Sequence, residues 1–405
     1  MDLKYARCAG LDVHKDTVVA SIRLAGGKAT VQTRTFGTTT SALLDLGEWL
    51  AGMEVTHVAM EATGVYWKPV WHILAPSFQL TLANPAHIKN VPGRKTDVKD
   101  AEWVAQLHAH GLVEASFVPP EPIQELRALT RDRRQYHRES AQHVQRIQKI
   151  LQDANIKLDS VLSDVMGASG RAMLDAIVRG ETDPRALARL ADRRVRASAD
   201  ELAEALRGVV TDRHRAALRR HLATFDHLLL SIAEIDDEVA ALTEPFCRAV
   251  ELLDTIPGVD VKTAEVLVAE IGSDMSRFPT AAHLVSWAGL APRNDESAGK
   301  RRSTRVGKGG QWLKATLVQA AWAATRTKNS HLQSLFLRLR GRRGAKKAII
   351  AVAAEMLRSA WHMLSRDQPY TPPTAASAAD PEKLARRLVE KIRKLGFQVE
   401  LSTAA

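Results

Sequence analysis

Hydrophobic and polar positions in the first forty residues follow a pattern that predicts β-strands. Residues 7–13, 17–24 and 30–36 are short runs of apolar and β-branched residues, and Gly26-Gly27 stands between the second run and the third. Runs of this length separated by tight turns are typical of an antiparallel meander. We therefore expect three antiparallel strands at the start of the chain.

Helical and strand patterns then alternate up to about residue 108. The predicted elements are a helix at 41–50, a strand at 55–60, a helix at 65–74, a strand at 78–82 and a helix at 97–108. The order β-β-β-α-β-α-β-α is that of a ribonuclease-H-like α/β fold. In such a sheet the first and fourth strands are neighbours, and the last helix packs beside them.

The remainder of the chain has helical patterns. Pro119-Pro120-Glu121-Pro122 breaks the chain, and residues 123–162 then form a long polar helix pattern with sparse apolar positions. Its length and charge density suit a solvent-crossing hairpin or a coiled coil. Two further helical regions follow at 186–223 and 228–253.

A separate helical module with basic loops is expected at residues 255–361. After it, Pro369, Pro372 and Pro373 precede a run of Ala and Ser, which predicts a flexible linker. Residues 381–395 are expected to form a short terminal helix.

Charge and cysteine content restrict the possible partners and the cellular compartment. The chain has 405 residues and a formal net charge of +11, so it is long enough for two or three domains and attracts polyanions. It has neither a signal-peptide pattern at its start nor a run of roughly 20 apolar residues for a membrane span. The two cysteines, Cys8 and Cys247, suggest no disulfide framework and no zinc cluster, which fits a cytoplasmic protein.

Four carboxylates stand where the predicted fold brings them together. Asp12 ends the first strand, Glu61 ends the fourth, and Asp97 and Asp100 are three residues apart on one face of a predicted helix. Carboxylate oxygens are the ligands that Mg²⁺ prefers, and two such ions promote phosphodiester chemistry. For any one acid an ordinary exposed position is the better interpretation, but for all four together we predict a magnesium site.

Three neighbours of these acids are weaker candidates. His14 and Asp16 follow Asp12 closely, and Glu102 follows Asp100. We expect His14 to be structural or to face the substrate, and Glu102 to point away from the face that carries the two aspartates.

A helix-hairpin-helix is predicted at residues 253–271, with Gly258 in the hairpin. The free N–H groups at the start of the following helix suit a phosphate. A plain helical turn explains the same residues nearly as well.

The next segment, residues 287–310, combines small residues with clustered cations. Lys and Arg neutralise phosphates, and glycines let a backbone approach closely. The cations expected to bind nucleic acid are Arg293, Lys300, Arg301, Arg302, Arg305 and Lys308. A second cationic run, at residues 338–347, is expected to be a solvated face that also meets nucleic acid.

A serine hydroxyl in this segment is able to attack a phosphodiester if its proton is removed and the phosphate charge is compensated. Ser297 and Ser303 are equal candidates on composition alone, and serines in loops usually serve only as polar surface residues.

Four motifs resemble those of the DEDD-type insertion-sequence transposases. They are GLDVHK at 10–15, MEATGVY at 60–66, KTDVKDA at 95–101 and the segment 289–310, in the family's order. The resemblance extends from about Arg7 to Trp361. It implies a RuvC-like domain at 1–118, a helical or coiled-coil dimerisation region at 119–250, a mainly α-helical transposase domain at 251–365, and a flexible linker with a short C-terminal element at 366–405.

The resemblance also implies residue roles. Asp12, Glu61, Asp97 and Asp100 would be the tetrad that binds magnesium, and Ser297 would be the nucleophile, because the family's serine precedes a small residue and a glycine. Here that pair is Ala298-Gly299, although the family often has glycine where Ala298 stands.

The implied activity is excision and insertion of an insertion-sequence element by magnesium-dependent strand exchange through a serine–DNA link. A structured noncoding bridge RNA would pair with donor and target DNA. The protein would act as a dimer or tetramer, with the acids of one subunit serving the serine of another.

Two other functions stay open. One is a RuvC-like nuclease in which water attacks and Ser297 is structural. The other is a non-catalytic nucleic-acid-binding protein, against which the presence of all four acids argues.

Overall fold

The computed structural model describes two compact units, Met1–Val118 and Pro119–Ala405. The described residues are 3–24, 30–62, 64–83, 88, 100–292, 295–297, 300–303, 305–307, 309–372, 389–390, 392–393 and 396–399. The expected turn at Gly26-Gly27 and most of the expected helix at 381–395 lie outside them. None of the helices in the described part combines the length and apolar composition needed to cross a membrane.

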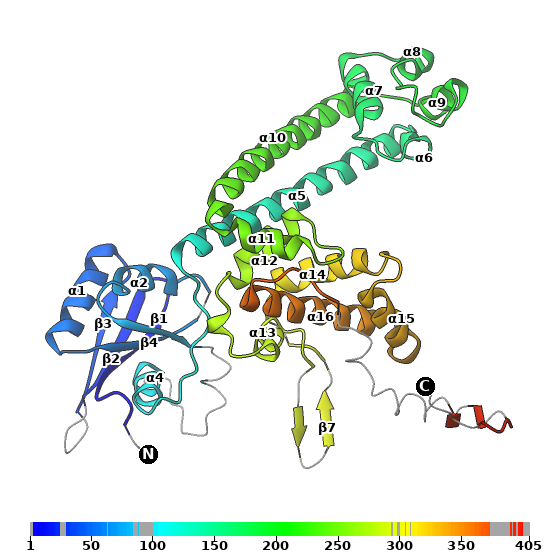
Figure 1. Ribbon diagram of the computed structural model, residues 1–405. Helices are drawn as coiled ribbons and strands as arrows, with labels where there is room; N and C mark the ends of the chain where they lie inside the picture. The colour runs from blue at the N-terminus through cyan, green and yellow to red at the C-terminus, as the bar shows by residue number, and fades with distance from the viewer. Residues whose placement is uncertain are drawn as a thin grey trace. The chain divides into compact units, whose positions relative to one another are not determined.

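The first unit is built on a five-stranded mixed sheet with the strand order β3-β2-β1-β4-β5 (Figure 1). The strands are β1 (Arg7–Val13), β2 (Thr17–Leu24), β3 (Thr30–Gly37), β4 (His57–Glu61) and β5 (Gln79–Ala83). β1 pairs antiparallel with β2 and parallel with β4, while β2–β3 is antiparallel and β4–β5 is parallel. The predicted meander and the predicted neighbourhood of the first and fourth strands are confirmed.

Three helices of the described residues cover this sheet. They are α1 (Thr40–Gly52), α2 (Trp67–Leu74) and α4 (Asp100–Ala109). The odd-numbered residues of β1, such as Leu11, pack into a core with the leucines of α1 and the apolar face of α2. The even-numbered residues, which include Gly10 and Asp12, face the opposite side, because successive side chains of a strand alternate.

The helix α4 lies directly on the even-numbered face of β1. A Cβ atom built on Gly10 would lie 2.3 Å from the carbonyl oxygen of Ala101 and 2.3 Å from the amide nitrogen of Ala105. Backbone therefore packs on backbone, and only glycine permits that approach.

The contacts along α4 also fix its direction. The amides of Lys4 and Tyr5 donate to the carbonyl of Ala109, at 2.8 and 3.1 Å, while the Cys8 thiol contacts the carbonyl of Ala105. Since Ala101 lies over Gly10, α4 runs antiparallel to β1. Its first residue, Asp100, therefore lies toward the end of β1 that carries Asp12.

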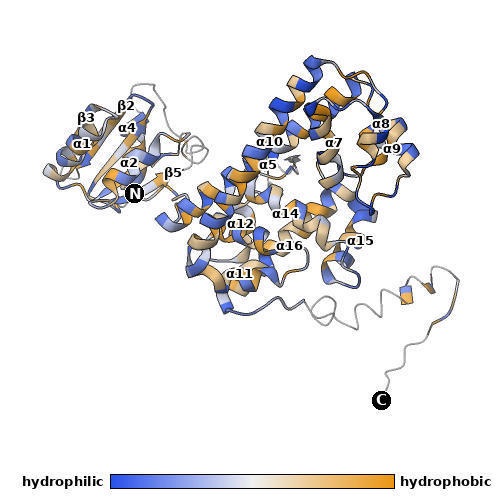
Figure 2. Ribbon diagram, turned by 90° about the horizontal axis from the view of Figure 1, so that it is seen from above, coloured by the Kyte–Doolittle hydropathy of each residue, from blue (hydrophilic) through white to orange (hydrophobic). Residues whose placement is uncertain are grey.

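The second unit begins with two long antiparallel helices, α5 (Glu121–Asp153) and α10 (Asp212–Thr243) (Figure 1). Polar and charged residues cover much of both helices (Figure 2). They are joined at their far end by α6 (Leu158–Val161), α7 (Ala168–Arg179), α8 (Pro184–Ala188) and α9 (Ala199–Ala205). Of the two arrangements expected for this region, a hairpin or a coiled coil, the hairpin is confirmed, because α5 and α10 of the same chain pack against each other.

Helix boundaries in this region differ from the sequence expectation. The helix predicted to reach residue 162 ends at Asp153, and Asn155 follows with a φ of 55°. The region 186–223 is not one helix, because α9 begins after a capping box at Ser198 and α10 begins after a capping box at Thr211. α10 then continues through the break expected near residues 223–228.

The C-terminal part of the second unit is a helical module. Its helices are α11 (Cys247–Asp254), α12 (Val261–Ile271), α13 (Ala281–Trp287), α14 (Gln311–Ala324), α15 (His331–Arg343) and α16 (Ala345–Arg366), with short 3₁₀ turns at Glu244–Phe246 and Met275–Arg277. A two-stranded antiparallel hairpin, β6 (Asp295–Ser297) and β7 (Lys300–Ser303), interrupts the helices. This hairpin was not predicted from the sequence, which indicated only a basic loop.

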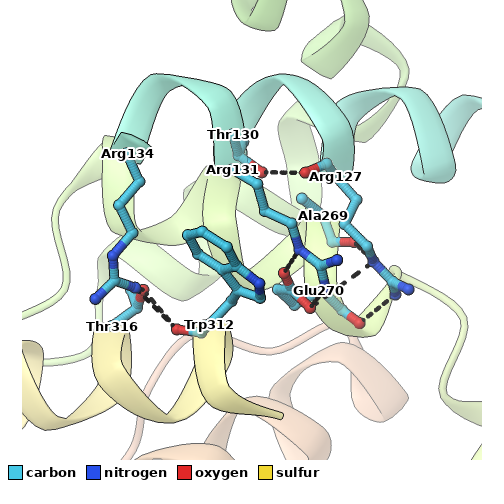
Figure 3. A network of polar contacts seen from close by, with 8 residues as sticks. All are labelled: Arg127, Thr130, Arg131, Arg134, Ala269, Glu270, Trp312 and Thr316. Atoms are coloured by element: carbon cyan, nitrogen blue, oxygen red, sulfur yellow. Dashed lines mark hydrogen bonds and ion pairs between the residues drawn. The ribbon is translucent and has the colours of Figure 1, made fainter. Parts of the chain in front are cut away.

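Arginines near the start of α5 fix the two long helices to this module (Figure 3). Arg131 binds both carboxylate oxygens of Glu270, at 2.8 and 2.9 Å, and Arg127 donates to the carbonyls of Ala269 and Glu270. The Glu270 side chain is 3% exposed, so removing its partners would leave a buried charge uncompensated. Residues 119–250 and 251–365 accordingly pack as one unit.

Replacing Gly10 tests the packing of α4 on the sheet. Gly10→Ala should destabilise the first unit by at least about 1–3 kcal/mol, because an added methyl group meets backbone atoms that have no room to move aside. Thermal unfolding of the full chain measures this. Gly52→Ala is the matched control, since its Cβ would meet nothing within 4 Å. Equal melting temperatures for Gly10→Ala and the wild type would refute the packing.

Acidification should destabilise the first unit through His108. Burial, followed by the nearby charges of His57 and Lys4, lowers the pKa of His108 from 6.5 to about 4. The neutral ring is therefore favoured in the folded state, and stability is lost as the pH falls from 6.5 toward 4. At pH 5 the loss is on the order of 2 kcal/mol.

The difference in melting temperature between pH 7 and pH 5 measures this loss. His108→Gln should shrink that difference, whereas the control His72→Gln, at an exposed position, should keep it. An unchanged difference in His108→Gln would show that other groups cause the acid sensitivity.

Candidate metal site and nucleic-acid module

The register between β1 and β4 places Asp12 beside Glu61. Gly10 pairs with Ala59 and Leu11 pairs with Met60, so the next position brings the two acids to neighbouring places. Paired residues of adjacent strands point to the same side of a sheet. That side is the α4 side, because Ala59 packs against Val104 and Leu107 of α4.

Asp100 lies near the same corner of the unit. It is the first residue of α4, which runs antiparallel to β1 from the Asp12 end. The positive end of the helix macrodipole favours a carboxylate there. Three of the four predicted acids are thus brought toward the C-terminal ends of two parallel strands, while Asp97 lies outside the described residues.

Two residues near these acids, His14 and Glu102, have polar contacts in the structure. His14 Nε2 lies 3.2 Å from Asp12 Oδ2, and the two side chains are 60% and 28% exposed. The hydroxyl of Thr33 donates to Glu102 Oε1 at 3.4 Å, which directs that carboxylate across the sheet toward β3. His14 is therefore the candidate for positioning the Asp12 carboxylate at the solvent-facing edge of the site.

The donor set suits magnesium in chemical type, because carboxylate oxygens are hard ligands. Within the described ranges, however, no three His, Cys, Asp or Glu side chains are grouped closely enough to hold a metal ion. The magnesium site stays a prediction, in which Asp97 is a required member. Cys8 and Cys247 are free thiols, one buried and one exposed.

Gly258 has a packing role in the helix-hairpin-helix. The second helix of the predicted helix-hairpin-helix is confirmed as α12, and Gly258 before it has a φ of +85°. A Cβ atom there would lie 2.4 Å from the amide nitrogen of Ala324 and 2.5 Å from the carbonyl oxygen of Ala320. The phosphate-binding role of Gly258 stays a prediction, and the close approach to α14 explains the glycine without it.

The start of α12 is also capped by an acid. The Asp260 carboxylate accepts a hydrogen bond from the amide of Thr263 at 2.8 Å. A phosphate at this helix start would meet a negative charge, which favours the interpretation of a plain helical turn.

The two candidate serines occupy different ends of the β6–β7 hairpin. Ser297 pairs with Lys300 beside the turn, whereas Ser303 pairs with Asp295 at the base. Arg305 is exposed just after β7. Arg293 and Lys308 lie outside the described residues, as do the side chains of Ser297, Lys300, Arg301 and Arg302.

A cleft of about 780 Å³ lies between α5, α12 and α14. Arg133 belongs to the long polar helix, and its guanidinium binds Asp236 and Glu265, each at 2.9 Å. Lys262 also pairs with Asp236. Arg133 on α5 and Lys262 on α12 thus connect helices within the unit, and no sequence signal pointed to that role.

Comparison with protein families identifies two matching regions. Residues 9–156 match a family model described as "Transposase", that of the IS110 type with a DEDD motif, and residues 250–336 match the model "Transposase IS116/IS110/IS902 family". The first contains Asp12, Glu61, Asp97 and Asp100, and the second contains Ser297.

Several relatives resemble part of the chain. A pilin gene-inverting protein of Moraxella bovis is 31% identical over 146 residues, which are 35% of this chain and 45% of that protein. The transposase for insertion sequence element IS1111A of Coxiella burnetii is 31% identical over 146 residues, 35% of this chain and 39% of that protein. An uncharacterised 43.6 kDa protein of insertion element IS110 from Streptomyces coelicolor is 42% identical over 73 residues, 18% of each chain. The matches thus span less than half the length of each of these relatives.

Proposed function

Because the chain carries both domains of the IS110 family of transposases, we propose that it is a DNA transposase that excises and inserts an insertion-sequence element. The observation that carries this proposal is the placement of Asp12, Glu61 and Asp100. Strand register and the direction of α4 bring these acids toward one corner of the first unit. Acids gathered in this way suit phosphodiester chemistry, because carboxylate oxygens are the ligands that magnesium prefers.

Asp12, Glu61, Asp97 and Asp100 would hold magnesium in this activity. When bound, the metal supplies positive charge that promotes loss of the attacking hydroxyl's proton and stabilises the leaving oxygen. The carboxylates set its position, and His14 would orient Asp12 through the contact between its Nε2 and Oδ2.

Ser297 would supply the attacking hydroxyl. Its oxygen forms a bond to a DNA phosphorus while the bond from that phosphorus to one deoxyribose oxygen breaks, and the released oxygen takes up a proton. A hydroxyl of another DNA end then attacks the phosphoserine, which rejoins DNA and restores the serine. Each exchange replaces one phosphoester bond with another, so no other co-reactant is needed.

The partners in this proposal are DNA and a structured noncoding guide RNA. One relative is named for inverting a pilin gene and another for an insertion sequence element, which supports DNA as the substrate here. The net charge of +11 favours binding of either polyanion. The guide RNA and a homo-oligomer, dimer or tetramer, follow from the family resemblance alone.

A hydrolytic RuvC-like nuclease is the second candidate function. The same acids would serve it, with water in place of Ser297 as the nucleophile. A covalent protein–DNA adduct separates the two, since hydrolysis produces none.

Loss of the acids should stop DNA cleavage. Asp12→Asn, Glu61→Gln and Asp100→Asn should each lower magnesium-dependent strand cleavage at an element junction by at least about a hundredfold, because charge compensation at the phosphate is lost. Gel assays measure cleavage, and circular dichroism checks the fold. The control Asp16→Asn, at an exposed position three residues past the end of β1, should retain activity. Normal cleavage by Asp12→Asn would rule out the assignment.

Substitution of the two serines tests the nucleophile. Ser297→Ala should lose both the adduct, seen as a DNA-bound band on a denaturing gel, and recombination, because no hydroxyl remains to form the bond. Ser303→Ala should keep both. An adduct that persists in Ser297→Ala would show that another residue is the nucleophile. If subunits share the site, a mixture of Ser297→Ala and Asp12→Ala proteins should regain part of the activity.

A further inference from the structure

An acid-free stretch occupies the C-terminal module. From Ser297 to Ala354 the chain has no Asp or Glu in 58 residues, although acids make up about one residue in nine of the whole sequence. The same stretch has 14 Lys and Arg residues. Its positive charge therefore has no local compensation along the chain.

Six of these cations gather where α15 ends and α16 begins, and all six are exposed. We name this group the α15–α16 patch; its members are Arg338, Arg340, Arg342, Arg343, Lys346 and Lys347. Among the ion pairs formed by the described residues, none includes a member of the patch.

Helix packing turns the patch toward solvent. Leu332 and Phe336 are the buried residues of α15. Arg338 and Arg342 lie about one turn apart, and the 3.6-residue period turns both away from Phe336. Arg340 lies over the Phe336 ring, with its guanidinium carbon 5.8 Å from the ring centre.

Helix stability explains only part of this arrangement. Cations in the last turn of α15 interact favourably with its macrodipole. Arg338 and Arg342, however, are like charges at i and i+4, which repel each other. Lys346 and Lys347 stand in the first turn of α16, where the macrodipole disfavours cations and Gly344 supplies no side-chain cap. A bound polyanion would relieve both unfavourable interactions.

We propose that the α15–α16 patch binds the phosphate backbone of duplex nucleic acid, independently of base sequence. Exposed long cations that form no ion pair with a described carboxylate are suited to contacting regularly spaced phosphates. An anionic membrane surface fits less well, because interfacial helices also need a broad apolar face, and Leu337 is the one large apolar residue of α15 exposed among its described side chains. This binding goes beyond the proposed strand exchange and requires neither magnesium nor Ser297.

Charge removal tests the patch directly. Binding of the full chain to a short labelled DNA duplex and to an RNA duplex is measured by fluorescence anisotropy, without magnesium and over a range of salt concentrations. Arg338→Gln, Arg342→Gln and Lys346→Gln are combined in one variant. This variant should bind the duplex at least about tenfold more weakly near 0.1 M salt. The slope of the logarithm of its binding constant against the logarithm of the salt concentration should be shallower by about 2–3, because three phosphate contacts are lost.

Two further variants are the controls. Arg193→Gln, Arg194→Gln and Arg196→Gln remove three exposed charges from the segment between α8 and α9, and this triple variant should stay close to the wild type. Arg338→Lys with Arg342→Lys keeps the charge and should retain binding. A loss of binding to either the DNA or the RNA duplex supports the proposal and identifies which polymer the patch contacts.

Equal effects of the two triple variants would overturn the proposal, and so would a loss of binding in the lysine variant. Weaker binding to vesicles of anionic lipid, with duplex binding unchanged, would assign the patch to a membrane instead. Failure of the proposed transposase activity is measured separately by cleavage and leaves these binding results unaffected.

Discussion

The backbone of α4 lies directly against Gly10 of β1, and the candidate metal site depends on this contact. Glycine permits an approach at which any Cβ atom would meet Ala101 and Ala105. The contact holds α4 antiparallel to β1, so that the helix starts near the end of the strand that carries Asp12. The parallel register between β1 and β4 adds Glu61 on the same face. Packing of a helix on a sheet thus brings together acids that are far apart in the sequence.

The sequence predicted the strand order because each strand of the first unit has a strong local pattern. That order predicts Asp12 beside Glu61, and the observed register, which pairs Leu11 with Met60 one position earlier, supports that prediction. The direction of α4 could not be predicted from the pattern, because it depends on how closely two backbones approach at Gly10. The position of Asp97, the fourth acid of the tetrad, beside the other three stays a prediction.

The helical unit was less predictable because its boundaries depend on caps and tertiary contacts. The capping boxes at Ser198 and Thr211 divide a region whose apolar pattern gave no clear break. Arg127 and Arg131 lie in a stretch whose sequence pattern indicates only a polar helix, yet they bind the buried Glu270 and fix α5 to the C-terminal module. Gly258 matched a phosphate-binding hairpin by pattern, but its contacts with α14 explain it by packing.

Iron-mediated backbone cleavage tests the central claim most directly, because Fe²⁺ occupies magnesium sites and generates hydroxyl radicals that cut nearby peptide bonds. The full chain is treated with Fe²⁺, ascorbate and peroxide, and the fragments are identified by mass spectrometry. A shared metal site predicts cuts near Asp12, near Glu61 and around residues 97–100, all of which excess magnesium suppresses. Cuts at only one of these segments, or cuts that magnesium leaves unchanged, would contradict a shared metal site.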